Sequence, residues 1–446
     1  MIAMQIIDKF YESKKYFSEL INLSIPMIIG NLGQVLIGAT DVFIAAKHST
    51  DTLAAISIAN SIIFCILVMG MGLMSAISIQ MSNLRGNRKP TKKFLFTTLN
   101  YSMILAVIFC VICLLMVPLI PHMGFEANLV PMIKEYIFIC AFSLFGMYLY
   151  QALREFLMAY EIVNFPNIIL LFALVINFLL AYALVFGFGP VPALGVVGLA
   201  LAAFIVRMLM GIVLLVYCLG LIRFKNPFDA ALIKQLLKIG YPIGIAMFLE
   251  FLGFNLITIL VGREAGILAA THNIGVTITS SAYVIPMSIS AAIAIKVGFF
   301  NGARNYNEIV KYSMFGTLMS VIFMGCCSIL MIACPKQIFG IFTQNSEMLA
   351  LGLPILYIAA FYLMFDGLQV SLSGVLKGLK MTKVASISLI AGYWLFGLPF
   401  GYFLAYHYNM SLRGFWIGLA TSFLFMSAIF LIVIFRKFKQ IKQLYE

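Results

Sequence analysis

The sequence predicts an all-α polytopic membrane protein with twelve transmembrane helices. The chain has 446 residues, of which 63% are hydrophobic and only 10% are charged, and its mean hydropathy is +1.07. Long apolar runs begin near residues 20, 53, 94, 131, 164, 194, 238, 266, 311, 351, 384 and 412. Continuous apolar runs of about 20 residues are typical of membrane-spanning helices. A transmembrane β-barrel would instead show short segments of alternating hydrophobicity.

The basic residues alternate between the predicted connections. Of the 29 Lys and Arg residues, 23 fall on one side of the predicted spans and five on the other, and Arg207 lies inside a span. The positive-inside rule places the basic side and both termini in the cytoplasm. Short loops and a start without a cleavable signal peptide favour a bacterial cytoplasmic (inner) membrane. The net charge of +13 therefore reflects topology, and we expect no nucleic-acid partner.

The two halves of the chain repeat each other. Pro26 lies near the start of the first span, and Pro242 lies near the start of the seventh. We call the sequence separation between these two prolines the repeat offset. The same offset separates Gly86 and Gly302, which follow the second and eighth spans. Six spans per half predict two lobes related by a pseudo-two-fold axis along the membrane normal. The expected parts are an N-terminal lobe at 1–222, a cytoplasmic linker at 223–237 and a C-terminal lobe at 238–446.

The two repeated prolines also predict local geometry. Each proline removes a backbone hydrogen bond near the start of its span. Pro26 and Pro242 are therefore expected to bend the first and seventh helices.

Two acids in the second half carry the functional hypothesis. Glu250 lies inside the apolar stretch 239–261, roughly 17 Å from its start and near the middle of a bilayer core about 30 Å thick. Asp366 lies in the middle of its span, and Tyr362 precedes it by one helical turn on the same face. A charge at this depth is costly unless it faces a cavity, a partner or a cation. If both acids face one cavity, burial and repulsion favour binding of a proton or Na⁺; alternatively, one of them pairs with Arg207 and is structural.

Polar residues in the first half open a second possibility. Asp41 follows Gln34 in the outer part of the first span, and Asn177 lies within the fifth span. Asp41 is either interfacial or functional, and Asn177 either joins helices through a hydrogen bond or lies near Asp41 as a ligand.

Signals of enzymatic chemistry are absent from the sequence. There is no HExxH, Walker A or Gly-x-Ser-x-Gly pattern, and His48, His122, His272 and His407 are isolated. The eight cysteines lie mostly inside apolar runs without metal-ligand spacing. We therefore expect no enzyme and no cofactor, and any transport to be ion-driven or passive unless a separate subunit supplies ATP.

A set of residues in chain order matches one known family. The matching residues of the first half are Pro26, Gln34, Asp41, Leu53-Ala-Ala, Arg85-Gly86, Asn177, Gly187, Pro192 and Gly195-Val-Val-Gly198. Those of the second half are Pro242, Glu250, Leu268-Ala-Ala, Val297-Gly298, Asn301-Gly302, Asp366 and Gln369. Over essentially its whole length the chain resembles the MATE (multidrug and toxic compound extrusion) transporters, and Glu250 with Tyr362 and Asp366 resembles the NorM-like branch.

The resemblance implies secondary active efflux of small cationic or amphipathic compounds by Na⁺ or H⁺ antiport, with alternating access between two lobes. It implies a cation site at Glu250, Tyr362 and Asp366, with the two acids as metal ligands if the ion is Na⁺. It also implies a second polar cluster at Asp41 and Asn177, although Ala181 and Ala203 depart from the family pattern there. Gln34, Glu250 and Asp366 are expected to contact substrate.

Other functions fit the sequence less well. A flippase for lipid-linked oligosaccharides has related architecture, but an anionic substrate would require several Arg or Lys residues in the cavity, and only Arg207 lies within a span. A membrane-embedded enzyme lacks its catalytic residues, and a scaffold would leave the repeat and the central acids unexplained. We expect the protein to act as a monomer in the bilayer.

Overall fold

The computed structural model is almost entirely helical in the part of the chain that it describes. It gives the backbone of residues 2–189, 192–221 and 228–445, and among these the side chains of all but residues 2–12, 92–93, 221 and 444–445. Within these ranges, twelve helical spans are long and apolar enough to cross a membrane. The predicted fold class is therefore confirmed. Arg223 and Lys225, assigned above to the linker, lie outside the described residues.

Contacts divide the chain into two compact units. Unit 1 comprises Met1–Ile25, Ser82–Lys89 and Leu249–Glu446, and unit 2 comprises Pro26–Met81 and Pro90–Phe248. Unit 2 contains most of α1 (Ile2–His48), α2 (Thr50–Met74), most of α3 (Ala76–Gly86), η1 (Thr91–Phe94), α4 (Leu95–Met116), η2 (Val117–Met123), α5 (Leu129–Met158), α6 (Asn164–Phe186), α7 (Gly195–Leu221) and the first part of α8 (Ala230–Glu264). Within it, α5 packs against α7, α4 and α2.

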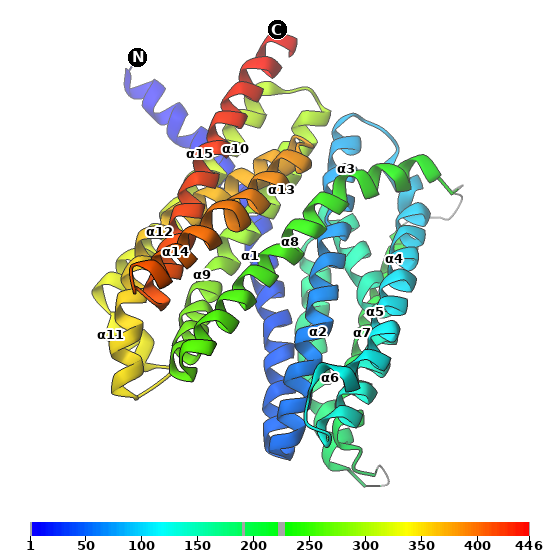
Figure 1. Cartoon of the computed structure of the whole chain (residues 1–446). Helices are drawn as coiled ribbons and strands as arrows, with labels where there is room; N and C mark the ends of the chain where they lie inside the picture. Colours follow the sequence, from blue (N-terminus) through cyan, green and yellow to red (C-terminus); the bar gives the residue numbers. More distant parts are fainter. Residues whose placement is uncertain (1, 190–191, 222–227, 446) are drawn as a thin grey trace. The chain divides into compact units, whose positions relative to one another are not determined.

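Unit 1 is built around α12 (Ser346–Gly378), which packs against α9 (Gly266–Gly302), α10 (Tyr306–Ala333) and α15 (Leu412–Tyr445) (Figure 1). The remaining elements of this unit are α11 (Pro335–Gly340), α13 (Thr382–Ile390), η3 (Ala391–Gly397) and α14 (Leu398–His407). Asn residues begin two of these helices: Asn305 caps α10 by accepting from Glu308 N–H, and Asn345 caps α12 by accepting from Glu347 N–H. A side-chain oxygen at this position satisfies a backbone donor that the helix leaves free.

Besides the short helix α3, which divides between Met81 and Ser82, two long helices pass from one unit to the other. In α1 the boundary falls between Ile25 and Pro26, and in α8 it falls between Phe248 and Leu249, beyond Pro242. Both helices continue through their prolines, so the expected bends stay predictions. The compact units also group residues differently from the predicted lobes, and α8 begins inside the expected linker. Each half of the chain therefore contributes the start of its first helix to the unit dominated by the other half.

The internal repeat is visible in four turns with one hydrogen-bond pattern. In each turn a residue with positive φ follows a helix: Arg88 (54°), Glu161 (64°), Arg304 (56°) and Lys380 (61°). The next residue donates its N–H to the carbonyl five residues earlier, as Lys89 does to Leu84 and Met381 does to Leu376. This is the Schellman arrangement, usually made with glycine. Arg88 and Arg304 are separated by the repeat offset, so equivalent positions of the two halves adopt the same strained conformation.

Gly86 and Gly302 make reciprocal close contacts inside unit 1. A Cβ atom added at Gly86 would lie 1.8 Å from the carbonyl oxygen of Phe299, and one added at Gly302 would lie 2.0 Å from that of Asn83. Because the repeat offset also separates Asn83 from Phe299, each turn contacts the equivalent of itself. Reciprocal contacts of this kind are produced by a two-fold axis, so the structure agrees with the predicted pseudo-two-fold relation. Any side chain at either glycine would separate the two turns.

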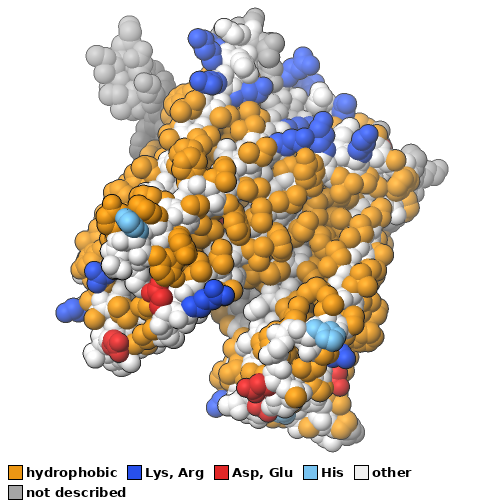
Figure 2. Space-filling model, in the orientation of Figure 1, with side chains coloured by type: hydrophobic (Ala, Val, Ile, Leu, Met, Phe, Trp, Pro, Cys, Tyr) orange, Lys and Arg blue, Asp and Glu red, His pale blue; other side chains and the backbone are white. Residues whose placement is uncertain are grey.

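Large hydrophobic side chains cover the surface. Phe172, Leu115 and Val216 are each more than 60% exposed, and hydrophobic side chains occupy most of the face in Figure 2, with charged ones near the ends of the helices. Such a surface is unfavourable in water and matches the hydrocarbon core of a bilayer. The protein is a multi-pass membrane protein.

Two basic residues that were counted in the connections instead lie buried in helices. Arg154 in α5 is 4% exposed and donates from Nη2 to Asn31 Oδ1 at 3.0 Å. Lys296 in α9 is 7% exposed and donates from Nζ to Glu19 Oε2 at 2.8 Å. Both residues lie near helix ends, where sequence alone does not separate a loop cation from a buried one. Neither of them is a marker of topology.

Candidate functional site

Glu250 is held by a turn of π-helix. Residues Ala391–Gly397 (η3) form this turn between α13 and α14, and it presents Tyr393 and Trp394 to α8. Tyr393 Oη donates to Glu250 Oε1 at 3.1 Å, and Trp394 Nε1 donates to the carbonyl oxygen of Leu249 at 3.2 Å. Turns of π-helix are rare and occur frequently at functional sites. Two consecutive aromatic residues therefore fix two consecutive residues of α8 at the carboxylate.

Asp366 lies beside Glu250 in unit 1. Its side chain is 5% exposed, and the Glu250 carboxylate is its electrostatic neighbour. Tyr283 of α9 is an electrostatic neighbour of both acids. Asp366 Oδ1 is buried and has no hydrogen-bond partner among the described residues. An unsatisfied carboxylate oxygen beside a second carboxylate is costly in an apolar interior, and binding of a proton or a cation would remove that cost.

Tyr362 lies on the same face of α12 as Asp366. Its ring stacks on Phe423 of α15 with centroids 4.9 Å apart, and its hydroxyl has Thr279 as its hydrogen-bonding neighbour. The hydroxyl that donates to a carboxylate of this cluster is instead that of Tyr393. Tyr362 therefore forms part of the wall of the acidic cluster, and Asp366 is its electrostatic neighbour.

The two acids differ in their charged neighbours among the described residues. Lys377 of α12 is a positive electrostatic neighbour of Glu250, whereas the charged neighbour of Asp366 is the Glu250 carboxylate. Arg207, which could have paired with one of them, belongs to unit 2, where it donates from Nη1 to Ser143 Oγ at 2.7 Å.

Unit 2 brings Asp41 and Asn177 together. Asn177 Nδ2 donates to Asp41 Oδ1 at 2.7 Å, and both side chains are buried. Arg207 is an electrostatic neighbour of Asp41. Asn177 Oδ1 has no hydrogen-bond partner among the residues described. The Asp41 carboxylate thus has both a donor and a positive neighbour, whereas the charged neighbour of Asp366 is a second carboxylate. Ala181, one turn after Asn177, is fully buried and adds no polar atom.

Gln34, the third expected substrate contact, is half-buried on α1 and belongs to unit 2. Glu250 and Asp366 belong to unit 1, so the expected substrate-binding set is divided between the units. Its role stays a prediction.

Sequence reasoning missed several polar residues in the spans. Tyr393 and Tyr283 join the acidic cluster, but tyrosines in a chain with 20 of them give no distinguishing signal. Glu155 is a further buried acid, which accepts from Ser78 Oγ at 2.5 Å and from Gln151 Nε2 at 3.1 Å. Its position next to Arg154 near the end of α5 resembles an interfacial pair. Only burial reveals it.

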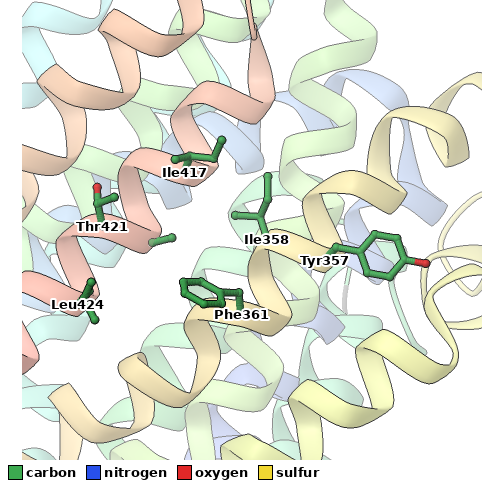
Figure 3. A pocket seen from close by; sticks show the side chains of 7 residues that line it. Tyr357, Ile358, Phe361, Ile417, Thr421 and Leu424 are labelled. Carbon is green, nitrogen blue, oxygen red and sulfur yellow. The ribbon is translucent and has the colours of Figure 1, made fainter.

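An apolar groove on α12 and α15 lies apart from the acids. It has a volume of about 350 Å³ and is lined by Tyr357, Ile358, Phe361, Ile417, Ala420, Thr421 and Leu424 (Figure 3). Phe361 is 63% exposed, whereas the adjacent Tyr362 is 3% exposed, so the groove opens toward the exposed side of α12 and the acidic cluster toward its buried side. The groove therefore faces the bilayer and is not the candidate cation site.

Comparison with known proteins gives one consistent result. The MatE family model matches residues 26–183 and 242–403. A probable multidrug resistance protein NorM of Mesorhizobium japonicum is 29% identical over 426 residues, covering 92% of this chain and 91% of the relative. The eukaryotic MATE transporter AtDTX14 superposes with a TM-score of 0.84 at 19% identity, covering 97% of this chain and all of that one. An outward-facing multidrug resistance MATE transporter of the MOP superfamily superposes with a TM-score of 0.85 at 18% identity, covering 95% and 96% of the two chains.

Proposed function

Since the chain belongs to the MatE family, whose members compared above are transporters and not enzymes, we propose that it exports organic cations in exchange for Na⁺ or H⁺. The observation that carries this proposal is the buried pair of acids in unit 1. Asp366 Oδ1 has no partner among the described residues, and Glu250 is its electrostatic neighbour. A membrane protein retains such a pair at a considerable energetic cost, which a bound cation or proton offsets.

The chemistry of the cluster suits a small hard cation or a proton. Carboxylate oxygens of Glu250 and Asp366 and the hydroxyls of Tyr283 and Tyr393 are oxygen ligands, which Na⁺ prefers. A proton on Asp366 would convert an unsatisfied acceptor into a hydrogen-bond donor beside the other carboxylate. Either ion removes one negative charge from the same place.

This change of charge is what couples the two transport steps. With both acids ionised, the cluster attracts an organic cation, and the aromatic rings around it favour a positively charged, partly apolar compound. A bound proton or Na⁺ weakens that attraction and releases the compound. Net export follows if the affinity of the cluster for the ion differs between the outward-open and inward-open states, because equal affinity would shift nothing.

The orientation follows from the distribution of Lys and Arg. We infer that both termini lie in the cytoplasm and that the protein works as a monomer in the inner membrane. Exchange of the ion inward then drives the organic cation outward. An oligosaccharide-lipid flippase suits the site less well, because its anionic substrate would meet two carboxylates in unit 1.

The test is efflux of ethidium from proteoliposomes under a Na⁺ gradient and, separately, under a pH gradient. Glu250→Gln and Asp366→Asn are each expected to abolish the gradient-driven part. Asp41→Asn is the matched control, because Asp41 is also an aspartate with 5% exposure, located in unit 2. Ethidium efflux that survives both unit 1 substitutions and is lost with Asp41→Asn would move the coupling site to unit 2.

A further inference from the structure

His272 is a buried histidine with one defined hydrogen bond. It lies on α9, its side chain is fully buried, and its Nδ1 accepts from Trp416 Nε1 at 3.2 Å. The indole N–H is only a donor, so Nδ1 of the imidazole must be unprotonated and the proton of the neutral ring lies on Nε2. Nε2 has no partner with good hydrogen-bond geometry among the described residues, although the backbone carbonyl of Phe254 is a looser hydrogen-bonding neighbour of the ring. The contact to Trp416 is therefore the well-formed hydrogen bond of this side chain.

The indole of Trp416 fits closely against α9. A Cβ atom added at Gly275 would lie 2.7 Å from Cζ2 of Trp416, so only glycine leaves space for the ring there. His272 and Gly275 are three residues apart and lie on one face of the helix. One residue therefore holds the N–H edge of the indole, and the other accommodates its six-membered ring.

A series of aromatic rings leads from this contact to the acidic cluster. Trp416 lies 6.1 Å from Tyr362 between ring centroids, and Tyr362 stacks on Phe423 at 4.9 Å. Phe423 meets Tyr393 edge to face at 5.8 Å, and Tyr393 donates to Glu250. These rings thus form a continuous series from the His272–Trp416 hydrogen bond to the Glu250 carboxylate.

We propose that His272 is a positioning residue for the cation site: it fixes the indole of Trp416 against Tyr362 and thereby sets the geometry around Asp366. The inference rests on the proposed function, because it concerns the same site. Without an acceptor, the buried indole N–H is unsatisfied and the ring turns toward another partner. Tyr362 then loses its packing surface one helical turn from Asp366, and the affinity for the coupling ion falls.

The experiment compares His272→Leu, which removes the acceptor, with His272→Asn, whose side-chain oxygen can take the place of Nδ1. Ethidium efflux from proteoliposomes is measured over a series of external Na⁺ concentrations at fixed pH and over a series of external pH values without Na⁺. An unsatisfied buried donor predicts that His272→Leu raises the half-saturating ion concentration about tenfold, with the maximal rate within about twofold of wild type. His272→Asn is expected to stay within about threefold of wild type for both quantities.

Trp416→Phe supplies the second test, because it removes the donor that needs His272. Adding His272→Leu to Trp416→Phe should produce no further change in the half-saturating concentration. Additive effects of the two substitutions would overturn the inference, since they would show that His272 does not act through Trp416. An unchanged half-saturating concentration in His272→Leu, or equal damage from Leu and Asn, would overturn it as well.

A binding measurement in detergent does not depend on transport. The chain has two tryptophans, Trp394 and Trp416, so the fluorescence response to Na⁺ or to acid can be assigned with Trp416→Phe. In His272→Leu, the ion concentration at half response should shift by the same factor as in transport. A titration that does not shift contradicts the inference about His272. The proposed function would still stand in that case if Asp366→Asn abolishes gradient-driven efflux. If wild-type vesicles respond to neither gradient, the proposed function fails, and the role of His272 fails with it.

Discussion

The two halves use different chemistry at one equivalent contact. In unit 1, Lys296 Nζ donates to Glu19 Oε2 at 2.8 Å, and Tyr312 Oη donates to the same oxygen at 2.5 Å. In unit 2, Gln80 Nε2 donates to Gln235 Oε1 at 2.7 Å. The repeat offset separates Gln80 from Lys296 and also Glu19 from Gln235. The double substitution Glu19→Gln with Lys296→Gln therefore reproduces in unit 1 the contact that the chain already uses in unit 2.

The magnitudes follow from the exposure of each side chain. Counting side-chain atoms alone, Lys296 is 8% exposed and Glu19 is 35% exposed. Glu19→Gln leaves a buried ammonium without its carboxylate, which is expected to cost about 3 kcal/mol of stability. Lys296→Gln leaves a carboxylate that is partly hydrated and still accepts from Tyr312, so its cost should be only about 1 kcal/mol. The double variant contains no unpaired charge and should lie within about 1 kcal/mol of wild type.

Thermal unfolding of the purified protein in detergent measures the order of these variants. The expected order of midpoints, from lowest to highest, is Glu19→Gln, then Lys296→Gln, then the double variant close to wild type. This order requires that the two single effects do not add. Each substitution removes one charge of the pair, and the double variant therefore leaves neither charge unpaired. A double variant as unstable as the sum of the singles would refute the reasoning. It would mean that the ion pair itself, and not the avoidance of an unpaired charge, stabilises this contact.

Three further predictions concern other parts of the molecule. Gly302→Ala places a methyl group 2.0 Å from the carbonyl oxygen of the facing turn, and should lower stability by about 2 kcal/mol in the same thermal assay. Lys380→Gly relieves a φ of 61° and should raise stability by about 1 kcal/mol. The pKa of Lys380 is lowered to about 8 by burial and by repulsion from Lys89, so the unfolded chain binds the Lys380 proton more tightly than the folded chain. The stability of the wild type should therefore rise as the pH increases from about 8 to 10.5. In Lys380→Gly this rise should be absent. Asn177→Ala removes the donor to Asp41 and should cost about 2 kcal/mol, read from the unfolding midpoint; an unchanged midpoint would show that water replaces the amide.

Much of the fold could be predicted because membrane spans leave a strong signal. The apolar runs are long, and each predicted run coincides with one helical span of the structure. The repeat was visible in glycine and proline, whose backbone roles leave little choice of residue: Gly86 and Gly302 lie where a side chain has no space. The exchange of α1 and α8 between units was not predictable, since it depends on which tertiary contacts the start of each helix makes.

The site could be predicted only where a residue contrasts with its surroundings. Glu250 and Asp366 stand out as acids in apolar runs, and the structure brings them together. Tyr393 does not stand out, and the π-helical turn that carries it has no sequence signature of the kind a helix cap has. For the opposite reason Arg154 was counted in a connection and Glu155 was missed, because charged residues near a span end are ordinarily interfacial.

The difference between the two acidic clusters decides where a coupling ion gains most. Asp41 and Asp366 are both 5% exposed, but Asp41 accepts a 2.7 Å hydrogen bond and has Arg207 as a positive neighbour. Asp366 has a second carboxylate as its neighbour and an oxygen without a partner among the described residues. A cation arriving at Asp41 would meet an existing positive charge, whereas at Asp366 it would relieve repulsion between two negative ones. Because coupling requires that ion occupancy change the energy of a state, the asymmetry between otherwise repeated halves favours unit 1 as the coupling unit.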